Sequence, residues 1–362
     1  MAQSRYHRQM LLPWIGEAGQ ARLAQATVAV VGCGALGCVS ASWLVRAGVG
    51  HVKLIDRDVV ERTNLQRQLL FDEDDASYAR PKAEAAKAKL AAANRDVRVT
   101  AIIDDLDHRN IDEHAGDADV LLDATDNFET RFLLNDFAAF AGRAYLYAGV
   151  VATVGMMYPV LPHTQRGGTP WEQAGVAGPC LRCLFQDAPP PGPDSGPTCQ
   201  TAGVLGPAVG VIASLQASEA IKILTHNWAS VSRCMVHVDL ASLTFRQLDV
   251  TTSDECGACP CCGQHRFDYL DGKHASRTTK LCGRNAVQLA RAADAGSIAL
   301  EALAERLSAY GPVRCNELML WARVQDGDRS YELTVFENGR AIVKGTEDPA
   351  TARSVYARFV GG

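Results

Sequence analysis

The apolar residues of this chain occur in short runs that alternate with glycine turns and helical stretches. The first run, TVAVVG at residues 27–32, is rich in β-branched side chains and predicts a fully buried strand. The turn GCGALG and a stretch of small residues follow it, and then HVKLID, which ends at Asp56, predicts a second strand. A strand, a glycine turn, a helix and a further strand in this order indicate a βαβ unit.

The same alternation continues beyond this first unit. The pattern predicts a helix over 81–93 with Pro81 at its start, strands over 97–103, 118–124 and 144–149, and a helix after Thr130. Strands that alternate with helices imply a mostly parallel sheet with helices on both of its faces. The sequence therefore predicts a doubly wound, Rossmann-like α/β fold.

Two later segments interrupt this alternation. The stretch QDAPPPGPDSGPT at 186–198 is rich in proline and glycine, and it predicts a mobile crossover segment. Residues 204–224 are apolar with many small side chains and predict a long helix. We expect both segments to belong to a first domain that spans residues 1–266.

The last hundred residues have a different pattern. Two helices are predicted over 298–309 and 349–359, and a hairpin is predicted from the runs at 331–336 and 341–344. We therefore expect a small C-terminal α+β domain over residues 267–362.

The composition excludes several classes of protein. The net charge of −5 provides no basic surface for nucleic acid. No apolar run reaches the length of a membrane span, and the first residues lack the order of a signal peptide, so we expect a cytoplasmic protein without a membrane partner. Disulfides are rare in a reducing compartment, and the 12 cysteines therefore favour metal binding or thiol chemistry.

The glycine turn is a candidate phosphate-binding loop. Gly32, Gly34 and Gly37 form the pattern G-x-G-x-x-G between a strand and a helix, where the backbone can approach a phosphate at the positive end of the helix. Asp56 ends the next strand, where an acid can bind a ribose hydroxyl. These four residues by themselves suggest a dinucleotide site.

The residues that follow favour a nucleoside triphosphate instead. Asp58, Asn64, Arg67, Gln68 and Lys82 come after Asp56 in the segments DRDVVERTNLQRQLLF and RPK. Two cations, Arg67 and Lys82, match the negative charge of a triphosphate.

An acid pair ends the fourth predicted strand. Asp123 and Asp126 in LLDATDN should face the same edge of the sheet, and Asp126 could hold Mg²⁺ there. The alternative is that Arg67 and Lys82 are surface charges and that Asp126 caps a helix.

Six cysteines form two clusters with metal-ligand spacing. PCLRC contains Cys180 and Cys183, and ECGACPCCG allows either the pair Cys256 and Cys259 or the pair Cys259 and Cys262. Two CxxC pairs are typical of a four-thiolate zinc site. Dithiol redox chemistry is the less favoured alternative, because no thioredoxin-like context surrounds these pairs.

The other cysteines divide into one candidate nucleophile and several packing residues. Cys199 precedes the long predicted helix, where a helix N-terminus lowers the pKa of a thiol. The simplest interpretation of four others, Cys33, Cys38, Cys234 and Cys315, is as small apolar residues of a core.

The combined motifs resemble those of one known family. RYHRQ, GCGALG, IDRD, NLQRQ, RPK, DATDN, CxRC and TCQTAGVLGP resemble the MoeB/ThiF/HesA family, which is related to the ubiquitin-activating enzymes. The resemblance implies adenylation of the C-terminal Gly-Gly carboxylate of a ubiquitin-like sulfur-carrier protein, with MgATP as substrate and pyrophosphate as product. It leaves the molybdopterin, thiamine and related pathways open and slightly favours the molybdopterin branch.

The resemblance also assigns roles to residues. It implies a homodimer in which Arg8 reaches the phosphates of the partner subunit, and it favours Cys259 and Cys262 as the second zinc pair. It implies that Cys199 can bond covalently to the activated carrier, and a sulfur donor protein is a further expected partner. The residues to which it assigns ATP binding are Gly34, Asp56, Asn64, Arg67, Gln68, Lys82, Asp126 and Asn127.

Two other functions remain open from the sequence. An NAD-dependent oxidoreductase with a structural zinc would use the glycine loop and Asp56, but it gives Arg67, Lys82 and Asp126 no evident role. A non-catalytic scaffold that binds the carrier would not need the full set of ATP-site residues.

Overall fold

A computed structural model describes residues 4–164, 167–185, 202–250, 256–274, 278–281, 285–289, 298–316, 318–327, 329–337 and 339–361. The chain divides into two compact units, 1–275 and 276–362. Each unit has its own sheet and its own core.

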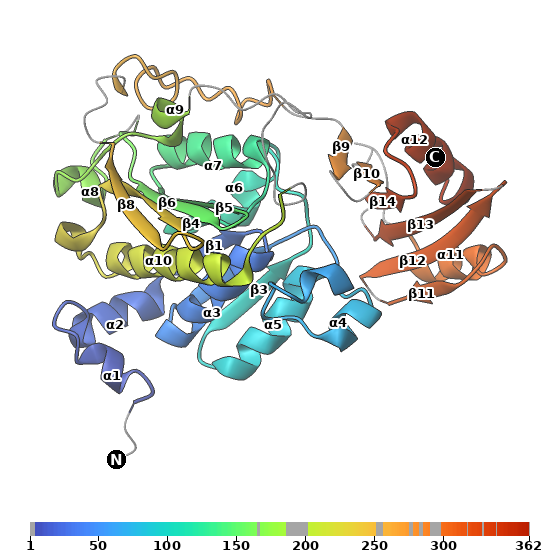
Figure 1. The fold of residues 1–362 in the computed structure, drawn as a ribbon, viewed down its shortest axis with the longest axis horizontal. Helices are drawn as coiled ribbons and strands as arrows, with labels where there is room; N and C mark the ends of the chain where they lie inside the picture. The colour runs from blue at the N-terminus through green and yellow to red at the C-terminus, as the bar shows by residue number, and fades with distance from the viewer. Residues whose placement is uncertain are drawn as a thin grey trace. The chain divides into compact units, whose positions relative to one another are not determined.

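The first unit contains a sheet in the order β3-β2-β1-β4-β5-β6-β7-β8 (Figure 1). Strands β3 to β5 pair in parallel, whereas β5 to β8 pair antiparallel. The strands are β1 (Thr27–Val31), β2 (His51–Ile55), β3 (Arg98–Ile102), β4 (Val120–Asp123), β5 (Ala144–Val151), β6 (Val154–Val160), β7 (Cys234–Asp239) and β8 (Thr244–Asp249). The predicted mostly parallel, Rossmann-like sheet is therefore confirmed, with an antiparallel extension that the sequence pattern did not indicate.

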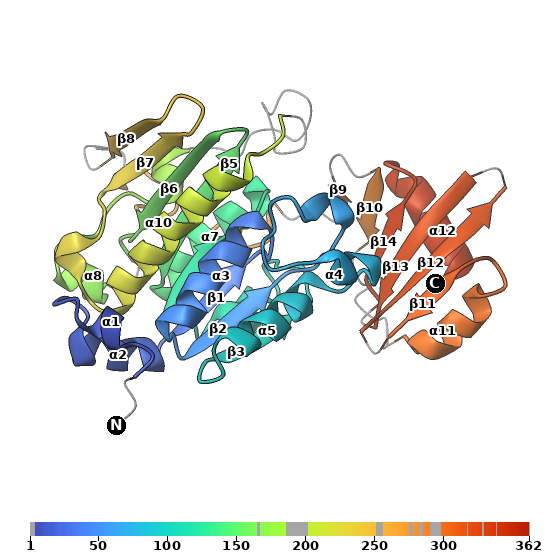
Figure 2. The ribbon, with the colours of Figure 1, turned by 60° about the horizontal axis from the view of Figure 1, so that its bottom comes forward.

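Helices cover both faces of this sheet, as predicted (Figure 2). Helices α3, α5 and α10 lie on one face, and α6 and α7 lie on the other. The helices of the unit are α1 (His7–Met10), α2 (Gly16–Gln25), α3 (Ala35–Ala47), α4 (Glu73–Ser77), α5 (Lys82–Ala93), α6 (Ile111–Ala115), α7 (Phe128–Ala141), α8 (Pro170–Gln173), α9 (Leu181–Leu184) and α10 (Gly206–Leu224), with short 3-10 turns at Arg62–Asn64 and Trp228–Ser230.

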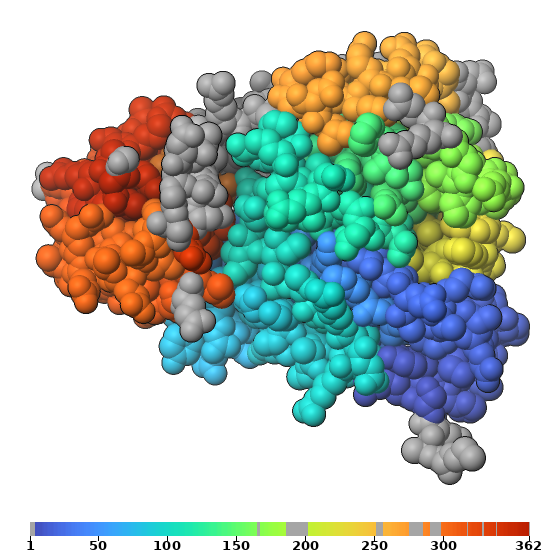
Figure 3. Space-filling model, turned by 180° about the vertical axis from the view of Figure 1, so that it is seen from behind, coloured from blue at the N-terminus to red at the C-terminus, as the bar shows by residue number. Residues whose placement is uncertain are grey.

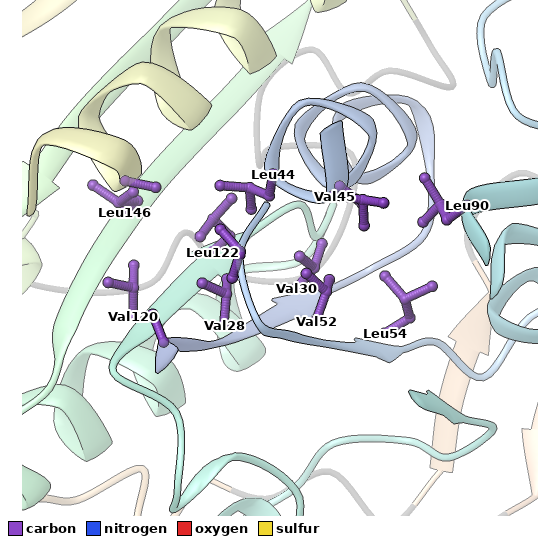
Figure 4. Close-up of a cluster of buried hydrophobic side chains, with 14 of the residues drawn as sticks. Val28, Val30, Leu44, Val45, Val52, Leu54, Leu90, Val120, Leu122 and Leu146 are labelled. Atoms are coloured by element: carbon purple, nitrogen blue, oxygen red, sulfur yellow. The ribbon is translucent and has the colours of Figure 1, made fainter. Parts of the chain in front are cut away.

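The alternation of side chains along β1 explains the two layers. Val28 and Val30 point into the cluster that contains Leu44 of α3 and Leu90 of α5 (Figure 4). Their neighbours on the same strand point to the opposite face and pack with α6 and α7. A strand that is apolar on both faces must be covered on both, so the run TVAVV requires this three-layer arrangement.

Helix α10 is the one described helix that is long and apolar enough to cross a membrane by length and composition. In this fold it packs against α3 and against strands β5 and β6, and its buried residues include Ile212 and Ala213. Its apolar character is explained by this burial within the first unit.

In its described residues, the second unit forms a six-stranded antiparallel sheet with two helices, which confirms the predicted α+β class. The order is β11-β12-β13-β14-β10-β9, and α11 and α12 pack on the core formed by Leu303, Leu333 and Val355. The elements are β9 (Thr278–Leu281), β10 (Ala286–Leu289), α11 (Leu300–Leu307), β11 (Val313–Cys315), β12 (Met319–Asp326), β13 (Arg329–Phe336), β14 (Ala341–Lys344) and α12 (Pro349–Phe359). The predicted hairpin is formed by β13 and β14.

Candidate functional site

The glycine loop between β1 and α3 requires glycine for steric reasons. Gly32 has a φ of +95°, and a Cβ there would lie 2.5 Å from the carbonyl oxygen of Ala124. A Cβ on Gly37 would lie 2.0 Å from the carbonyl oxygen of Gly32. Gly34 is the N-cap of α3, and the loop therefore presents backbone N–H groups at the positive end of that helix.

Asp56, at the end of β2, is hydrogen-bonded to this loop. Its carboxylate accepts hydrogen bonds from the backbone N–H of Cys33 at 2.6 Å and from that of Asp58 at 2.7 Å. Burial raises the pKa of the Asp56 carboxyl above its usual range, and the nearby Lys82 cation opposes that shift. The predicted acid therefore lies beside the loop.

Lys82 joins the same group from the start of α5. Its side chain is only 3% exposed, and its Nζ donates a hydrogen bond to Asp58 Oδ2 at 3.0 Å. The backbone N–H of Lys82 also donates to the carbonyl oxygen of Asp58 at 2.9 Å. A buried ammonium held in this way is a fixed positive charge next to the glycine loop. The interpretation of Lys82 as a surface charge is wrong.

The segment NLQRQ contributes residues with different degrees of burial. Asn64 is buried and accepts a hydrogen bond from the backbone N–H of Glu61, so its amide oxygen holds the local turn. Gln68 is 4% exposed, and a Cβ on Gly34 would lie 3.8 Å from its Nε2. The buried Oε1 of Gln68 has no hydrogen-bond partner among the described residues. Arg67 is partly exposed and donates to the carbonyl oxygen of Thr63.

The turn after β4 contacts the glycine loop. Ala124 in this turn lies so close to Gly32 that a Cβ on Gly32 would clash with its carbonyl oxygen. Asp126 in this turn is exposed. Asn127 is the N-cap of α7 and accepts a hydrogen bond from the backbone N–H of Thr130 at 2.8 Å. The capping residue is thus Asn127, and Asp126 remains at the surface of the turn.

Asp123 does not face the edge of the sheet, contrary to the sequence prediction. It is fully buried and accepts hydrogen bonds from Tyr145 Oη at 2.7 Å and from Thr125 Oγ1 at 2.8 Å. Arg131 Nε lies 3.6 Å from its Oδ2, and Arg131 also donates to the carbonyl oxygen of Thr125. Asp123 is therefore a structural anchor for the turn that carries Asp126.

Arg57 is a charged residue near the site that the sequence analysis did not select. Its Nη1 lies 2.7 Å from both carboxylate oxygens of Asp105. Burial alone would lower the pKa of the Arg57 guanidinium, but the carboxylates of Asp105, Asp58 and Asp126 raise it above its usual range. The sequence signal was the motif IDRD itself, in which a cation stands between two acids.

Arg8 lies at the other end of α3 from the glycine loop. The amide of Gln9 donates to the carbonyl oxygen of Ala47, and a Cβ on Gly48 would lie 2.6 Å from Tyr6. The 13 residues of α3 separate this end from Gly34, a distance of about 20 Å. Arg8 is exposed, and one chain does not bring it to the other site residues.

Four cysteines from two distant segments form a compact cluster. The Sγ atoms of Cys180, Cys183, Cys259 and Cys262 all lie within 4.8 Å of one another, and all four residues are buried. The separation is 3.6 Å between Cys180 and Cys259 and 3.4 Å between Cys183 and Cys262. A tetrahedral zinc with Zn–S bonds of about 2.3 Å requires S–S separations of about 3.8 Å. The cluster is compatible with zinc.

The two remaining cysteines of the motif lie beside this cluster. Cys261 is buried, and its Sγ accepts a hydrogen bond from Asn135 Nδ2 at 3.3 Å. Cys256 is half-buried, with its Sγ 3.7 Å from that of Cys183. The segment that carries them packs on α7, where Asp136 accepts a hydrogen bond from the backbone N–H of Tyr269. Figure 3 shows this segment, coloured light orange, against the teal surface of α6 and α7.

The prediction that four further cysteines are core residues is only partly correct. Burial raises the pKa of the Cys38 thiol to about 12 and that of Cys33 well above its usual value, so both thiols are inert packing groups. Cys234 is half-buried, and Cys315 is exposed on β11, which corrects the prediction for that residue. Strand β11 lies at the edge of the second sheet, and its residues Arg314 and Cys315 are both exposed. Cys199 lies outside the described residues.

Comparison with known proteins defines the family. Residues 6–261 match the ThiF family, and the chain therefore belongs to it, which confirms the resemblance seen in the motifs. A "Sulfur carrier protein ThiS adenylyltransferase" of Bacillus subtilis strain 168 is 40% identical over 358 residues, which cover 99% of each chain. A "SAMP-activating enzyme E1" of Haloferax volcanii is 36% identical over 267 residues, which cover 74% of this chain and 91% of that protein.

Solved structures show a similar fold. A crystal structure of Escherichia coli MccB with MccA-N7isoASN has a TM-score of 0.58 and 23% sequence identity, and the match covers 72% of this chain and 76% of that one. This likeness confirms the Rossmann-like fold of the first unit.

Proposed function

We propose that this protein adenylates the C-terminal Gly-Gly carboxylate of a ubiquitin-like sulfur-carrier protein. ATP would be the second substrate, and an acyl-adenylate and pyrophosphate would be the products. The observation that carries the proposal is the position of buried Lys82 beside Asp56 and the glycine loop. This group lies at the carboxyl edge of the parallel strands, where α/β folds bind nucleotides.

The residues at this edge suit the chemistry of adenylation. A carboxylate is a poor electrophile, and attachment of AMP gives it a good leaving group. The carrier carboxylate attacks the α-phosphorus while pyrophosphate leaves in line, so positioning and positive charge suffice without a protein nucleophile. The loop N–H groups, Lys82 and Arg67 would bind the phosphates, and Asp56 would face the ribose.

Asp126 would hold the magnesium ion. It is exposed, and it belongs to the same turn as Ala124, which contacts the glycine loop. A carboxylate oxygen is a preferred ligand of Mg²⁺. Magnesium supplies charge neutralisation on the phosphates. The guanidinium of Arg57, which is hydrogen-bonded to Asp105, would also interact electrostatically with the Asp126 carboxylate. The remaining residues proposed to contact ATP from this edge are Asn64, Gln68 and Asn127.

The same residues argue against the two alternative functions. A nicotinamide dinucleotide has no need of a buried ammonium that is fixed next to the loop, and a scaffold would have no need of the nucleotide site. The buried Oε1 of Gln68 favours a ligand as well, since buried polar atoms in folded proteins are almost always hydrogen-bonded.

Arg8 would act on the phosphates of a partner subunit in a homodimer. Within one chain it lies at the far end of α3, so only a second copy could bring it to the glycine loop. The exposed side chain of Trp43 on α3 is consistent with a partner surface on that helix. Cys199 is proposed to bond to the activated carrier in a later step, in which a donor protein would supply sulfur.

The four-cysteine cluster would hold a structural zinc. Cys180 and Cys183 flank the start of α9, and Cys259 and Cys262 belong to a segment about eighty residues later, so the ion would join two distant parts of the unit. The glycine loop lies at the end of β1, in a different part of the sheet, and the zinc therefore has no part in the proposed adenylation chemistry.

The carrier is proposed to be of the thiamine-pathway type, in a cytoplasmic setting. The Bacillus relative named for ThiS is similar over both units, whereas the Haloferax relative is similar over 267 residues only. This full-length likeness outweighs the slight preference for the molybdopterin branch that the motifs alone suggested.

ATP–pyrophosphate exchange with a panel of carriers tests the proposal. We expect exchange with a ThiS-type carrier and much weaker exchange with a carrier of the molybdopterin pathway. Exchange only with the molybdopterin-pathway carrier would overturn the assignment of the pathway but not that of the reaction. No exchange with any Gly-Gly carrier would overturn both.

A further inference from the structure

The thiol cluster contains more cysteines than a zinc ion needs. Four of them have Sγ atoms that all lie within 4.8 Å of one another, while Cys256 and Cys261 are additional thiols in the segment that carries Cys259 and Cys262. The two extra thiols differ in their surroundings, and that difference suggests a chemical role for one of them.

Cys256 is the least buried cysteine of the cluster. The four candidate ligands and Cys261 are buried, whereas Cys256 is half-buried. Its Sγ lies 3.7 Å from Cys183 Sγ, which is as close as the 3.8 Å that separates Cys183 from Cys180. A half-buried cysteine whose sulfur contacts a candidate metal ligand is well placed to react with that ligand.

Cys261 is positioned differently and serves as a comparison. It is fully buried, and Asn135 donates a hydrogen bond to its Sγ. The same Asn135 amide oxygen accepts a hydrogen bond from the backbone N–H of Leu181 at 2.7 Å, which fixes Asn135 in place. Cys261 is therefore shielded from solvent and held, although it belongs to the same motif.

We propose that Cys256 is a peroxide-sensitive modification site that releases the zinc ion by forming a disulfide with Cys183. In the first step the Cys256 sulfur attacks hydrogen peroxide, so that an S–O bond forms, the O–O bond breaks, and water leaves. In the second step the Cys183 thiolate attacks the sulfur of that sulfenic acid. The S–S bond forms, the S–O bond breaks, and the oxygen leaves as water after taking up a proton.

The electron balance closes with peroxide as the oxidant. Each of the two sulfurs gives up one electron, and the peroxide oxygens take up both. A zinc ion at this site would then keep only Cys180, Cys259 and Cys262 as ligands, and three thiolates would hold it more weakly than four. The inference rests on the proposed zinc site but not on the proposed adenylation reaction.

The test uses the full-length, zinc-loaded protein. Hydrogen peroxide is added in the presence of a chromogenic zinc chelator, and peptide mapping by mass spectrometry then locates the disulfide. We expect release of the bound zinc together with a Cys183–Cys256 linkage. A linkage between other cysteines, or zinc release without any disulfide, would overturn the proposal. This result is obtained with the parent protein and does not depend on any variant.

Three variants make the test specific. Cys256→Ser should bind zinc as the parent does and release it about tenfold more slowly under peroxide. Cys261→Ser, a matched control from the same motif, and Cys199→Ser should both release zinc at the parent rate. Equal release rates for Cys256→Ser and the parent would refute the role of Cys256. Protection by Cys199→Ser would show that Cys199 is the reacting thiol and would overturn the proposal. If the purified protein contained no zinc, the zinc site itself would be refuted. The proposed adenylation reaction would still stand.

Discussion

Lys82 Nζ lies 3.0 Å from Asp58 Oδ2, and this ion pair is almost completely buried on the lysine side. The pair ties the start of α5 to the loop after β2, and a bridge between Val59 and Pro81 reinforces the connection. The ammonium is thus held beside Asp56 before any substrate binds. A charge that is positioned in advance stabilises a transition state without a cost of reorganisation.

Lys82→Met should therefore remove most of the exchange activity. We expect a fall of about 10²- to 10³-fold in the rate of ATP–pyrophosphate exchange, because one fixed cation near the phosphates is lost. Lys87→Met on the same helix is the control, since the Lys87 side chain is 43% exposed and forms an ion pair with Glu84 on the surface of that helix. Equal rates for the two variants would show that Lys82 has no catalytic role. Circular dichroism would confirm that both variants fold.

Asp126→Asn should weaken the response to magnesium. Asp126 is exposed, so the substitution should leave the melting temperature unchanged. We expect the magnesium concentration for half-maximal exchange to rise about tenfold, because one anionic ligand becomes neutral. Glu113→Gln, an exposed change on α6, is the control and should behave as the parent. An unchanged magnesium dependence in Asp126→Asn would refute the assignment.

Arg8 provides a test of the partner subunit. Arg8→Ala and Lys82→Met would each be inactive alone, but a mixed dimer would contain one site with both residues intact. After dissociation and random reassociation of equal amounts, we expect about a quarter of the parent activity to return. If Arg8 acted within its own chain, mixing would restore nothing.

Removal of zinc should destabilise the first unit. The protein should bind one zinc per chain, and X-ray absorption should show four sulfur ligands at about 2.3 Å. Cys180→Ser should lower the melting temperature by about 10 °C, because a ligand that joins two distant segments is lost. Cys315→Ser, at an exposed position outside the cluster, should have no such effect. A stable Cys180→Ser variant with full zinc content would contradict the proposed ligand set.

Local patterns allowed much of this structure to be predicted from the sequence. The βαβ unit, the glycine loop and the CxxC pairs depend on residues that are close together in the chain, where spacing dictates geometry. The choice of Cys259 and Cys262 over Cys256 came from the family resemblance, and the cluster of four buried sulfurs agrees with it.

Contacts between distant segments explain what the sequence did not show. Asp123 looked like a site residue, but Tyr145, on the neighbouring strand, donates a hydrogen bond to it in the interior. Arg57 was passed over because its partner Asp105 lies in another loop. The antiparallel strands β6 to β8 come after the region in which strands and helices alternate. Their pairing depends on contacts with β5 and with one another, which no local sequence pattern indicates.

Mass spectrometry of the carrier itself would detect its adenylation directly. A ThiS-type carrier is incubated with this protein, MgATP and a pyrophosphatase, and a carrier that lacks its last glycine serves as the control. We expect the intact carrier to gain the mass of an adenylyl group at its C-terminal glycine, while the shortened carrier remains unchanged. Formation of ADP and phosphate without an adenylated carrier would contradict this expectation.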